Sequence, residues 1–325
     1  MKDKIIFKVV KILNRGSLVI FPTDTAYGLG CRIDKHAALK KLQKITRRPS
    51  NMPSPVLVSS LSMAQKYLQK TTPELKSLAR KFWPGPLTLI YRCKTQKVHP
   101  LVRGGKKTLG VRQPNHSLIL KIIKKIDVPI IGTSANIHGH QTPFNKKDLN
   151  PKLIKKVDLI IYGRCLHNQA STVLDLSKTP WQVLRRGSIK VVLVTGCFDV
   201  LHQEHKKFLK KSKKQGPILI VGVEPDSRVR ELKGKKRPAN KTQTRINNLK
   251  KLDIADQIFI LPPDFHQEEK RLTLLKKINP DILAISAADP FLKNKKKICQ
   301  KTNICLKIVL LYNPKVSTTK ILNSP

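Results

Sequence analysis

Acidic residues, aromatic residues and paired cysteines are all scarce in this chain of 325 residues. The six cysteines, at positions 31, 93, 165, 197, 299 and 305, form no C-x-x-C pair and show no zinc-binding spacing. We therefore expect free thiols in a reducing compartment and predict no metal site built from protein side chains. Aromatic residues make up only 5% of the chain, which disfavours recognition of nucleic acid by base stacking.

Long apolar runs are also missing. No run approaches the length of a membrane-spanning helix, and the start of the chain, Met1 to Lys4, leads into an ordinary short apolar stretch rather than a signal peptide. These observations predict a cytoplasmic protein with no membrane partner.

The shortage of acidic residues leaves a large positive charge. The 65 Lys and Arg residues against 20 Asp and Glu give a formal net charge of +45, which favours binding to a polyanion such as tRNA or another RNA. The lysines are spread over the whole chain and are not gathered in one tail. A general bias toward lysine therefore stays open as the alternative to specific RNA binding.

The length predicts about two domains, and 40% hydrophobic residues suffice for a core in each. Strand-like apolar runs cover residues 128–131, 159–162, 218–223 and 282–285, and helical patterns such as residues 37–45 and 118–126 lie between them. We predict an α/β protein with two domains, residues 1–189 and residues 190–325. No flexible linker separates them, and the second domain is expected to be a Rossmann-like parallel sheet.

The second half opens on the segment GCFDVLHQEH, residues 196–205, directly after the apolar run 191–194. A helix beginning near His202 would direct free backbone N–H groups at an anion. His202 and His205 are three residues apart, so both can reach the same phosphates from one helical face. The pattern predicts a nucleotide site, and two surface histidines on a basic helix are the alternative.

Residues 190–325 resemble the cytidylyltransferase-like nucleotidyltransferases, such as glycerol-3-phosphate cytidylyltransferase and the nucleotidyltransferase half of the heptose-nucleotide enzymes. Besides GCFDVLHQEH, the matching segments are SRVRELKG at 227–234, Arg237 with Pro238 and Arg245, NPD at 279–281 and VSTTKI at 316–321. The resemblance implies attack of a substrate phosphate on CTP or ATP with Mg²⁺, releasing pyrophosphate. It assigns the phosphates to His202 and His205, the departing charge to Arg245, the triphosphate tail to Ser317 and Thr318, and further nucleotide contacts to Gly196, Phe198 and Asp199.

The first half carries another ligand-binding pattern. The strand-like residues 17–21 precede the segment PTDTAYGLG at 22–30, where small hydroxyls and glycines suit a turn that binds a small polar molecule. An ordinary strand-to-helix turn is the alternative for this stretch taken alone.

Residues 4–189 resemble the YrdC-like threonylcarbamoyl-AMP synthases. After PTDTAYGLG, the matching segments are RP at 48–49, WPGPLT at 83–88, GVR at 110–112, TSAN at 133–136, STV at 171–173 and LRRG at 184–187. The resemblance implies a twisted α/β sheet domain that converts L-threonine, bicarbonate and ATP with Mg²⁺ into threonylcarbamoyl-AMP and pyrophosphate. It assigns threonine to Thr25, Arg112, Ser134 and Ser171, and ATP to Arg48, Asn136 and Arg185. It also implies a tRNA threonylcarbamoyl-transfer complex downstream.

Several residues depart from the two family patterns, among them Ala287 and Ala288, which stand before Asp289 where a glycine-rich stretch is usual. Thr46 stands where a lysine is usual, Met52 replaces a basic or polar residue, and Glu204 fills a glycine position between the two histidines. We predict a fused protein with two nucleotidyl-transfer sites. The alternative is a non-catalytic RNA-binding protein built on degenerate versions of both folds.

Overall fold

The computed structural model describes residues 2–311, which divide into two compact units, Met1–Ser177 and Lys178–Pro325. We call these the N-terminal and C-terminal units. The domain boundary expected at residue 189 stays a prediction. Both units combine helices with sheets, so the expected α/β class with two domains is confirmed.

The N-terminal unit contains two mixed sheets. One sheet has the order β7-β2-β1-β8, in which β1 runs antiparallel to β2 and parallel to β8. The other includes β9, β4, β5, β3 and β6 in this order, with β4 antiparallel to β5 and parallel to β9. The strands are β1 (Val19–Pro22), β2 (Tyr27–Gly30), β3 (Val56–Leu57), β4 (Leu87–Arg92), β5 (Thr108–Arg112), β6 (Ile130–Ile131), β7 (Thr133–Ser134), β8 (Leu159–Ile160) and β9 (Thr172–Asp175).

Amphipathic helices supply the rest of this core. In α6, Ile119, Ile122, Ile123 and Ile126 recur at helical spacing and are buried, while the lysines between them face outward. The helix ends at Asp127, whose φ of 51° lies in the left-handed region. The helices are α1 (Lys2–Asn14), α2 (His36–Thr46), α3 (Leu61–Tyr67), α4 (Pro73–Phe82), α5 (Pro100–Arg103), α6 (Ser117–Ile126), α7 (Pro151–Ile154) and the 3-10 helix η1 (Lys146–Asp148).

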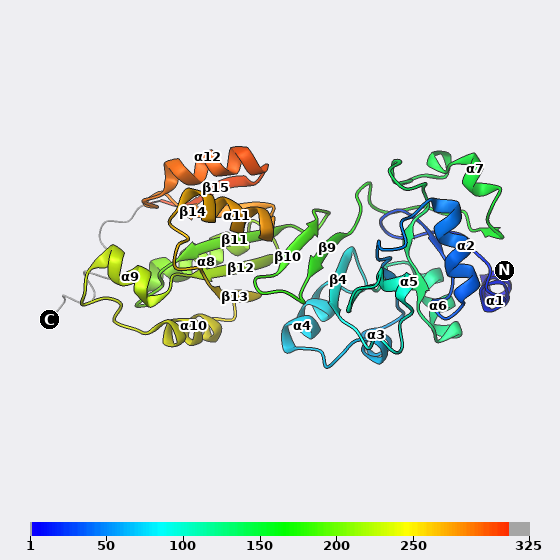
Figure 1. The fold of residues 1–325 in the computed structure, drawn as a ribbon, viewed down its shortest axis with the longest axis horizontal. Coiled ribbons are helices and arrows are strands. Elements are labelled where there is room, and N and C mark those ends of the chain that lie inside the picture. Colours follow the sequence, from blue (N-terminus) through cyan, green and yellow to red (C-terminus); the bar gives the residue numbers. More distant parts are fainter. Residues whose placement is uncertain (1, 312–325) are drawn as a thin grey trace. The chain divides into compact units, whose positions relative to one another are not determined.

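The C-terminal unit is built on one five-stranded sheet with the order β13-β12-β11-β14-β15. All four pairings are parallel, and helices pack around the strands (Figure 1). This confirms the Rossmann-like expectation. The strands are β11 (Val191–Gly196), β12 (Ile218–Val223), β13 (Gln257–Ile260), β14 (Ile282–Ser286) and β15 (Cys305–Leu310), and they are preceded along the chain by β10 (Gln182–Arg185).

The order of the strands in this sheet places a crevice at its carboxyl edge. β11 and β12 are continuous apolar runs buried on both faces, as a covered parallel strand requires. On one side of β11 the chain adds β12 and then β13, and it then crosses to β14 on the other side, so the loops after β11 and β14 diverge at the carboxyl edge. The surrounding helices are α8 (Gln203–Lys213), α9 (Asp226–Lys233), α10 (Thr242–Lys251), α11 (Glu268–Ile278) and α12 (Leu292–Thr302).

Candidate functional site

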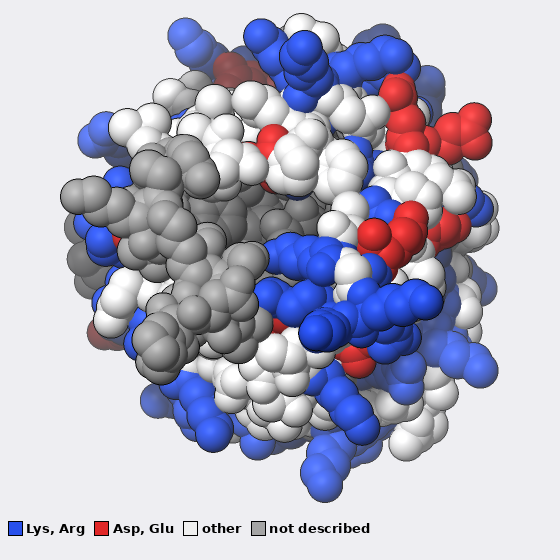
Figure 2. Space-filling model, turned by 90° about the vertical axis from the view of Figure 1, so that its left-hand side faces the viewer, with Lys and Arg blue, Asp and Glu red and all other residues white. Residues whose placement is uncertain are grey.

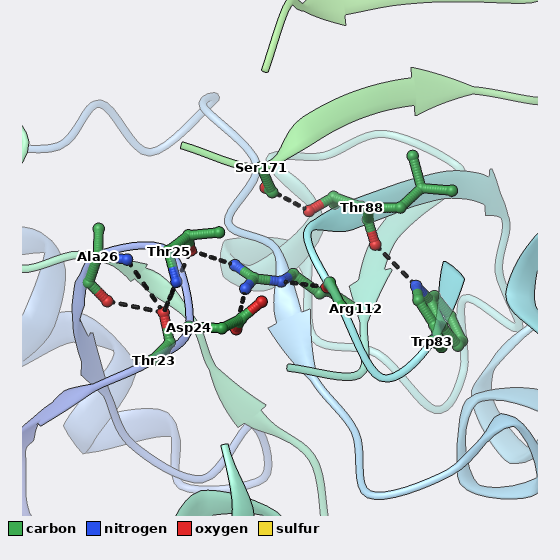
Figure 3. Close-up of polar contacts among 10 residues, drawn as sticks. Thr23, Asp24, Thr25, Ala26, Trp83, Thr88, Arg112 and Ser171 are labelled. Carbon is green, nitrogen blue, oxygen red and sulfur yellow. Dashed lines mark hydrogen bonds and ion pairs between the residues drawn. The ribbon is translucent and has the colours of Figure 1, made fainter. Parts of the chain in front are cut away.

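Arg112 is the centre of a buried polar cluster in the N-terminal unit. It ends β5 and is only 6% exposed. Its guanidinium donates from Nε to the Gly85 carbonyl at 3.0 Å and from Nη1 to the Thr25 hydroxyl at 2.7 Å, and it forms an ion pair with the Asp24 carboxylate (Figure 3). The structure therefore joins Thr25 and Arg112, two of the four residues predicted to bind threonine.

The turn between β1 and β2 presents Asp24 and Thr25 to this arginine. The Thr23 hydroxyl accepts from the backbone N–H groups of Thr25 and Ala26, both at 3.2 Å, and donates to the Ala26 carbonyl at 2.7 Å. These local bonds support the turn that joins the paired ends of β1 and β2. Asp24 is fully buried, and its Oδ2 atom has no hydrogen-bond partner among residues 2–311. The cluster therefore contains a guanidinium and an unsatisfied carboxylate oxygen next to hydroxyls.

Ser171 belongs to the same region of the fold. It immediately precedes β9, is 3% exposed, and its hydroxyl lies 2.9 Å from that of Thr88 on β4. Trp83 stabilises the turn before β4, because its indole N–H donates to the Leu87 carbonyl at 2.7 Å. Figure 3 draws Ser171 and Thr88 on the side of the cluster beside Arg112.

The predicted ATP residues Arg48 and Asn136 both line a small cavity of the N-terminal unit. Its volume is about 70 Å³, and its lining consists of Thr46, Arg48, Thr133, Ser134, Asn136 and His138. Arg48 donates to the Thr133 hydroxyl at 3.2 Å and to the Pro53 carbonyl at 2.7 Å. Ser134 donates to the amide oxygen of Asn136, so this predicted threonine residue lies with the ATP residues. Guanidinium, hydroxyl and amide groups in one pocket are the donors that phosphate oxygens need.

Thr46 and Met52, which depart from the family pattern, both occupy ordinary structural positions in this region. The Thr46 hydroxyl donates back to the Leu42 carbonyl at 2.7 Å, and Thr46 is 3% exposed at the end of α2. Met52 is partly exposed on a loop. Arg185 ends β10 in the C-terminal unit and is exposed, and its contact with ATP stays a prediction.

The C-terminal unit has a cavity of about 590 Å³ at the carboxyl edge of its sheet. The residues after β11 and β14, the start of α8 and the end of β15 line it, which is the position expected from the strand order. Of the predicted nucleotide residues, the lining includes Gly196, Phe198, Asp199, His202 and His205. The volume is in the usual range for a small-molecule or cofactor site.

His202 and His205 lie together as predicted. His202 directly precedes α8, and the two imidazole rings stack with centroids 3.8 Å apart. Phe198 contacts His205 edge-on at 5.5 Å. Burial lowers the pKa of both imidazoles, and the neighbouring His202 helps to hold the pKa of His205 at about 4. Neither ring therefore carries a positive charge at pH 7, which differs from the usual picture of histidines that neutralise phosphates.

Asp199 and Arg245 hold loops in place. Asp199 is 1% exposed, accepts from the backbone N–H groups of Ala239 and Asn240 at 3.0 and 2.8 Å, and pairs with Arg237 at 2.7 Å. Arg245 is fully buried and does not line the cavity. It donates to carbonyls of Cys197 and Asn240 and pairs with Asp226 at 2.7 Å. Its predicted role at the departing phosphate stays a prediction, while its contacts connect the loop after β11 to α9 and α10.

Sequence reasoning missed two charged residues of this cavity. Lys295 is 4% exposed and donates to the Thr195 hydroxyl at 3.1 Å and to Asp289 at 2.7 Å, although it lies within a run of lysines. Its spacing from the buried Ile298 and Cys299 could have placed it on the inner face of α12. Glu224, directly after β12, also lines the cavity, and no signal in the sequence distinguishes it. The predicted Ser317 and Thr318 lie outside the described residues.

Other expectations concern thiols, metals and membranes. All six cysteines are free thiols, as expected. Among residues 2–311, no group of three or more His, Cys, Asp and Glu side chains is placed to hold a metal ion. No helix in this range is long and apolar enough to cross a membrane.

Comparison with known proteins places both halves of the chain. Residues 11–187 match the Sua5/YciO/YrdC family, whose description is "Telomere recombination", and residues 193–323 match the cytidylyltransferase-like family. The chain is 34% identical over 178 residues to a threonylcarbamoyl-AMP synthase from Pyrococcus abyssi, covering 54% of this chain and 52% of that protein. It is 31% identical over 201 residues to the one from Bacillus subtilis, covering 62% and 58%.

The chain thus spans little more than half the length of these two curated relatives. The crystal structure of P. abyssi Sua5 complexed with L-threonine has a similar fold, with a TM-score of 0.56 over 96% of this chain and 97% of that one at 21% identity. Because the family match covers more than half of the sequence, this chain belongs to the Sua5/YciO/YrdC family and carries a cytidylyltransferase-like region in its second half.

Proposed function

We propose that this protein is an L-threonylcarbamoyladenylate synthase. The observation that supports this most directly is the cluster of Arg112, Asp24 and Thr25. Threonine is a zwitterion whose side chain carries a hydroxyl group. The cluster offers a guanidinium for its carboxylate, a carboxylate oxygen for its ammonium group and hydroxyls for its side chain. The two curated relatives described above are named threonylcarbamoyl-AMP synthases.

The proposed reaction consumes threonine, bicarbonate and ATP. The threonine nitrogen forms a C–N bond with bicarbonate carbon and water leaves, which gives a carbamate. A carbamate oxygen then attacks the α-phosphorus of ATP, the bond to the β-phosphate breaks, and pyrophosphate leaves. Arg48, Ser134 and Asn136 would bind phosphate oxygens in the smaller cavity. In this proposal Mg²⁺ enters with the nucleotide and supplies charge neutralisation, which suits a cavity with no carboxylate in its lining.

Mass spectrometry tests this proposal directly. The purified protein, incubated with ATP, L-threonine and bicarbonate, should release pyrophosphate and form threonylcarbamoyl-AMP, and omission of any one substrate should abolish the product. A folded protein that forms no product at saturating substrate would refute the proposal. It would favour the alternative of a non-catalytic RNA-binding protein, which Thr46 and its internal hydrogen bond also favour.

For the C-terminal unit we propose nucleotidyl transfer with CTP or ATP and Mg²⁺ to an acceptor that stays unnamed. The cytidylyltransferase-like match and the cavity at the carboxyl edge of the parallel sheet support this. The lining contains carboxylates, which are suitable ligands for Mg²⁺, but no cluster of three metal-binding side chains is described there. The cavity therefore suits a metal ion that enters already bound to the nucleotide.

We further propose that tRNA or another RNA is a partner and that a tRNA threonylcarbamoyl-transfer complex uses the product. The net charge of +45 supports the first of these. On the face drawn in Figure 2, basic side chains lie around most of the rim, whereas acidic ones are most numerous toward the right-hand side. Such a diffuse distribution favours binding with little sequence preference. A cytoplasmic location and the boundary at residue 189 are proposed on the sequence alone.

A further inference from the structure

Four carboxylates line the cavity of the C-terminal unit in a chain that is otherwise strongly basic. Three of them form ion pairs inside the unit, which are Asp199 with Arg237 at 2.7 Å, Glu204 with Lys207 at 2.9 Å and Asp289 with Lys295 at 2.7 Å. Among residues 2–311, the fourth, Glu224, has no ion pair and no side-chain hydrogen bond. A buried carboxylate without a partner is costly, so its surroundings need an explanation.

Glu224 is firmly placed in the fold. It directly follows β12, its backbone N–H donates to the Gly196 carbonyl at 3.0 Å, and the residue is 9% exposed. Its Oε2 atom is buried and has no hydrogen-bond partner among residues 2–311. Because Glu224 also lines the cavity, this oxygen belongs to a side chain that a ligand can reach.

Four cations that act on the Glu224 carboxylate are each held by another group. Burial raises the pKa of Glu224, and four cations from the surrounding helices, Arg228, Lys295, Arg271 and Arg245, oppose that rise. Each is held elsewhere: Arg228 pairs with Glu231 at 2.6 Å, Lys295 with Asp289, Arg245 with Asp226, and Arg271 lies against the rings of Phe265 and Phe291. No described cation of the unit directly neutralises Glu224.

Aromatic rings surround the same cavity. Phe198, Phe208 and Phe291 line it together with the stacked imidazoles of His202 and His205, although aromatic residues are only 5% of the chain. Since burial lowers the pKa of both histidines, these rings are neutral at pH 7. Aromatic faces attract organic cations through their quadrupole, most strongly where water is excluded.

We propose that the cavity of the C-terminal unit binds a small organic ammonium ion, with Glu224 as its counter-ion and the phenylalanine rings as its walls. The ammonium N–H groups would donate to the Glu224 carboxylate. A metal ion held by protein side chains alone suits the site less, because no cluster of three metal-binding side chains is described there and phenylalanine rings form part of the walls. The inference goes beyond nucleotidyl transfer and does not depend on it.

Calorimetric titration of the full-length protein with benzylamine and with benzyl alcohol tests the proposal, since the two probes differ in charge but little in size. Wild type should bind benzylamine at least tenfold more tightly at pH 7, because a hydrogen bond to a charged group adds that much discrimination. Glu224→Gln should bind the two probes equally. Without ligand, the same substitution should raise Tm, because it removes an unpaired buried charge.

Glu269→Gln is the matched control, because Glu269 is an exposed carboxylate of the same unit, in the first turn of α11, and it forms no described ion pair. It should leave the tenfold preference unchanged. Equal binding of both probes by wild type, or a preference that survives Glu224→Gln, would overturn the proposal. Titration with MgCl2 alone is the third arm, and Mg²⁺ binding that Glu224→Gln abolishes would replace the ammonium site by a metal site. These titrations contain no threonine or nucleotide, so their outcome is separate from the test of threonylcarbamoyl-AMP synthesis.

Discussion

Substitution of Arg112 by alanine should damage both folding and threonine binding, and the two effects can be separated. Arg112→Ala leaves the fully buried Asp24 carboxylate without its ion-pair partner. Removing one partner of a buried pair costs about 3–5 kcal/mol of stability. The same change removes the proposed partner of the threonine carboxylate. Loss of a charge-assisted bond worth about 2–3 kcal/mol weakens apparent affinity roughly 30- to 150-fold.

The double variant Arg112→Ala with Asp24→Ala distinguishes the two effects. Removal of both partners eliminates the unpaired charge, so most of the lost stability should return, whereas threonine affinity should not. Urea unfolding measures the first quantity, and the threonine dependence of pyrophosphate release measures the second. A double variant that is stable and still uses threonine with the wild-type apparent affinity would refute the assignment of Arg112 to substrate.

Three further predictions concern the C-terminal unit and the surface. Glu204→Gly should tighten CTP or ATP binding tenfold or more in calorimetric titration, because repulsion of a nearby phosphate is about 1–4 kcal/mol, and Glu204→Gln separates charge from bulk. Equal, undetectable binding in wild type and both variants would mean that this unit does not handle nucleotides. Because the folded state holds the pKa of His205 near 4, below the ordinary 6.5, wild type should lose up to about 3 kcal/mol relative to His205→Gln as pH falls from 6.5 to 4. Urea midpoints that shift equally with pH in both proteins would contradict this. Binding of tRNA should be detectable at low salt and collapse steeply as salt rises, and a strong preference for tRNA over random RNA at physiological salt would argue against a diffuse surface.

Local sequence patterns predicted the helices and strands well, but they did not predict the ion pairs. The apolar run 218–223 is β12 to the residue, and α8 begins directly after His202, because both follow from side-chain periodicity and end signals within a few residues. Arg245, which is predicted to act at the departing phosphate, is fully buried and donates to loop carbonyls. Burial of this kind depends on contacts between residues far apart in the chain. The pairing of Asp24 with Arg112 spans 88 positions, and no local pattern encodes it.

The large positive charge of the chain belongs to its surface and not to its interior. Among residues 2–311, the buried acidic residues are Asp24, Asp175, Asp199, Glu224 and Asp281, and the buried basic residues are Arg112, Arg228, Arg245, Arg271 and Lys295. The interior is therefore close to neutral, as the cost of burying unpaired charge requires. Salt screens exposed charges over about 10 Å at 0.1 M but affects buried pairs much less. Binding of a polyanion should consequently respond to salt far more steeply than binding of threonine at Arg112, so a shared steep response of both ligands would show that the substrate site is open to solvent rather than enclosed.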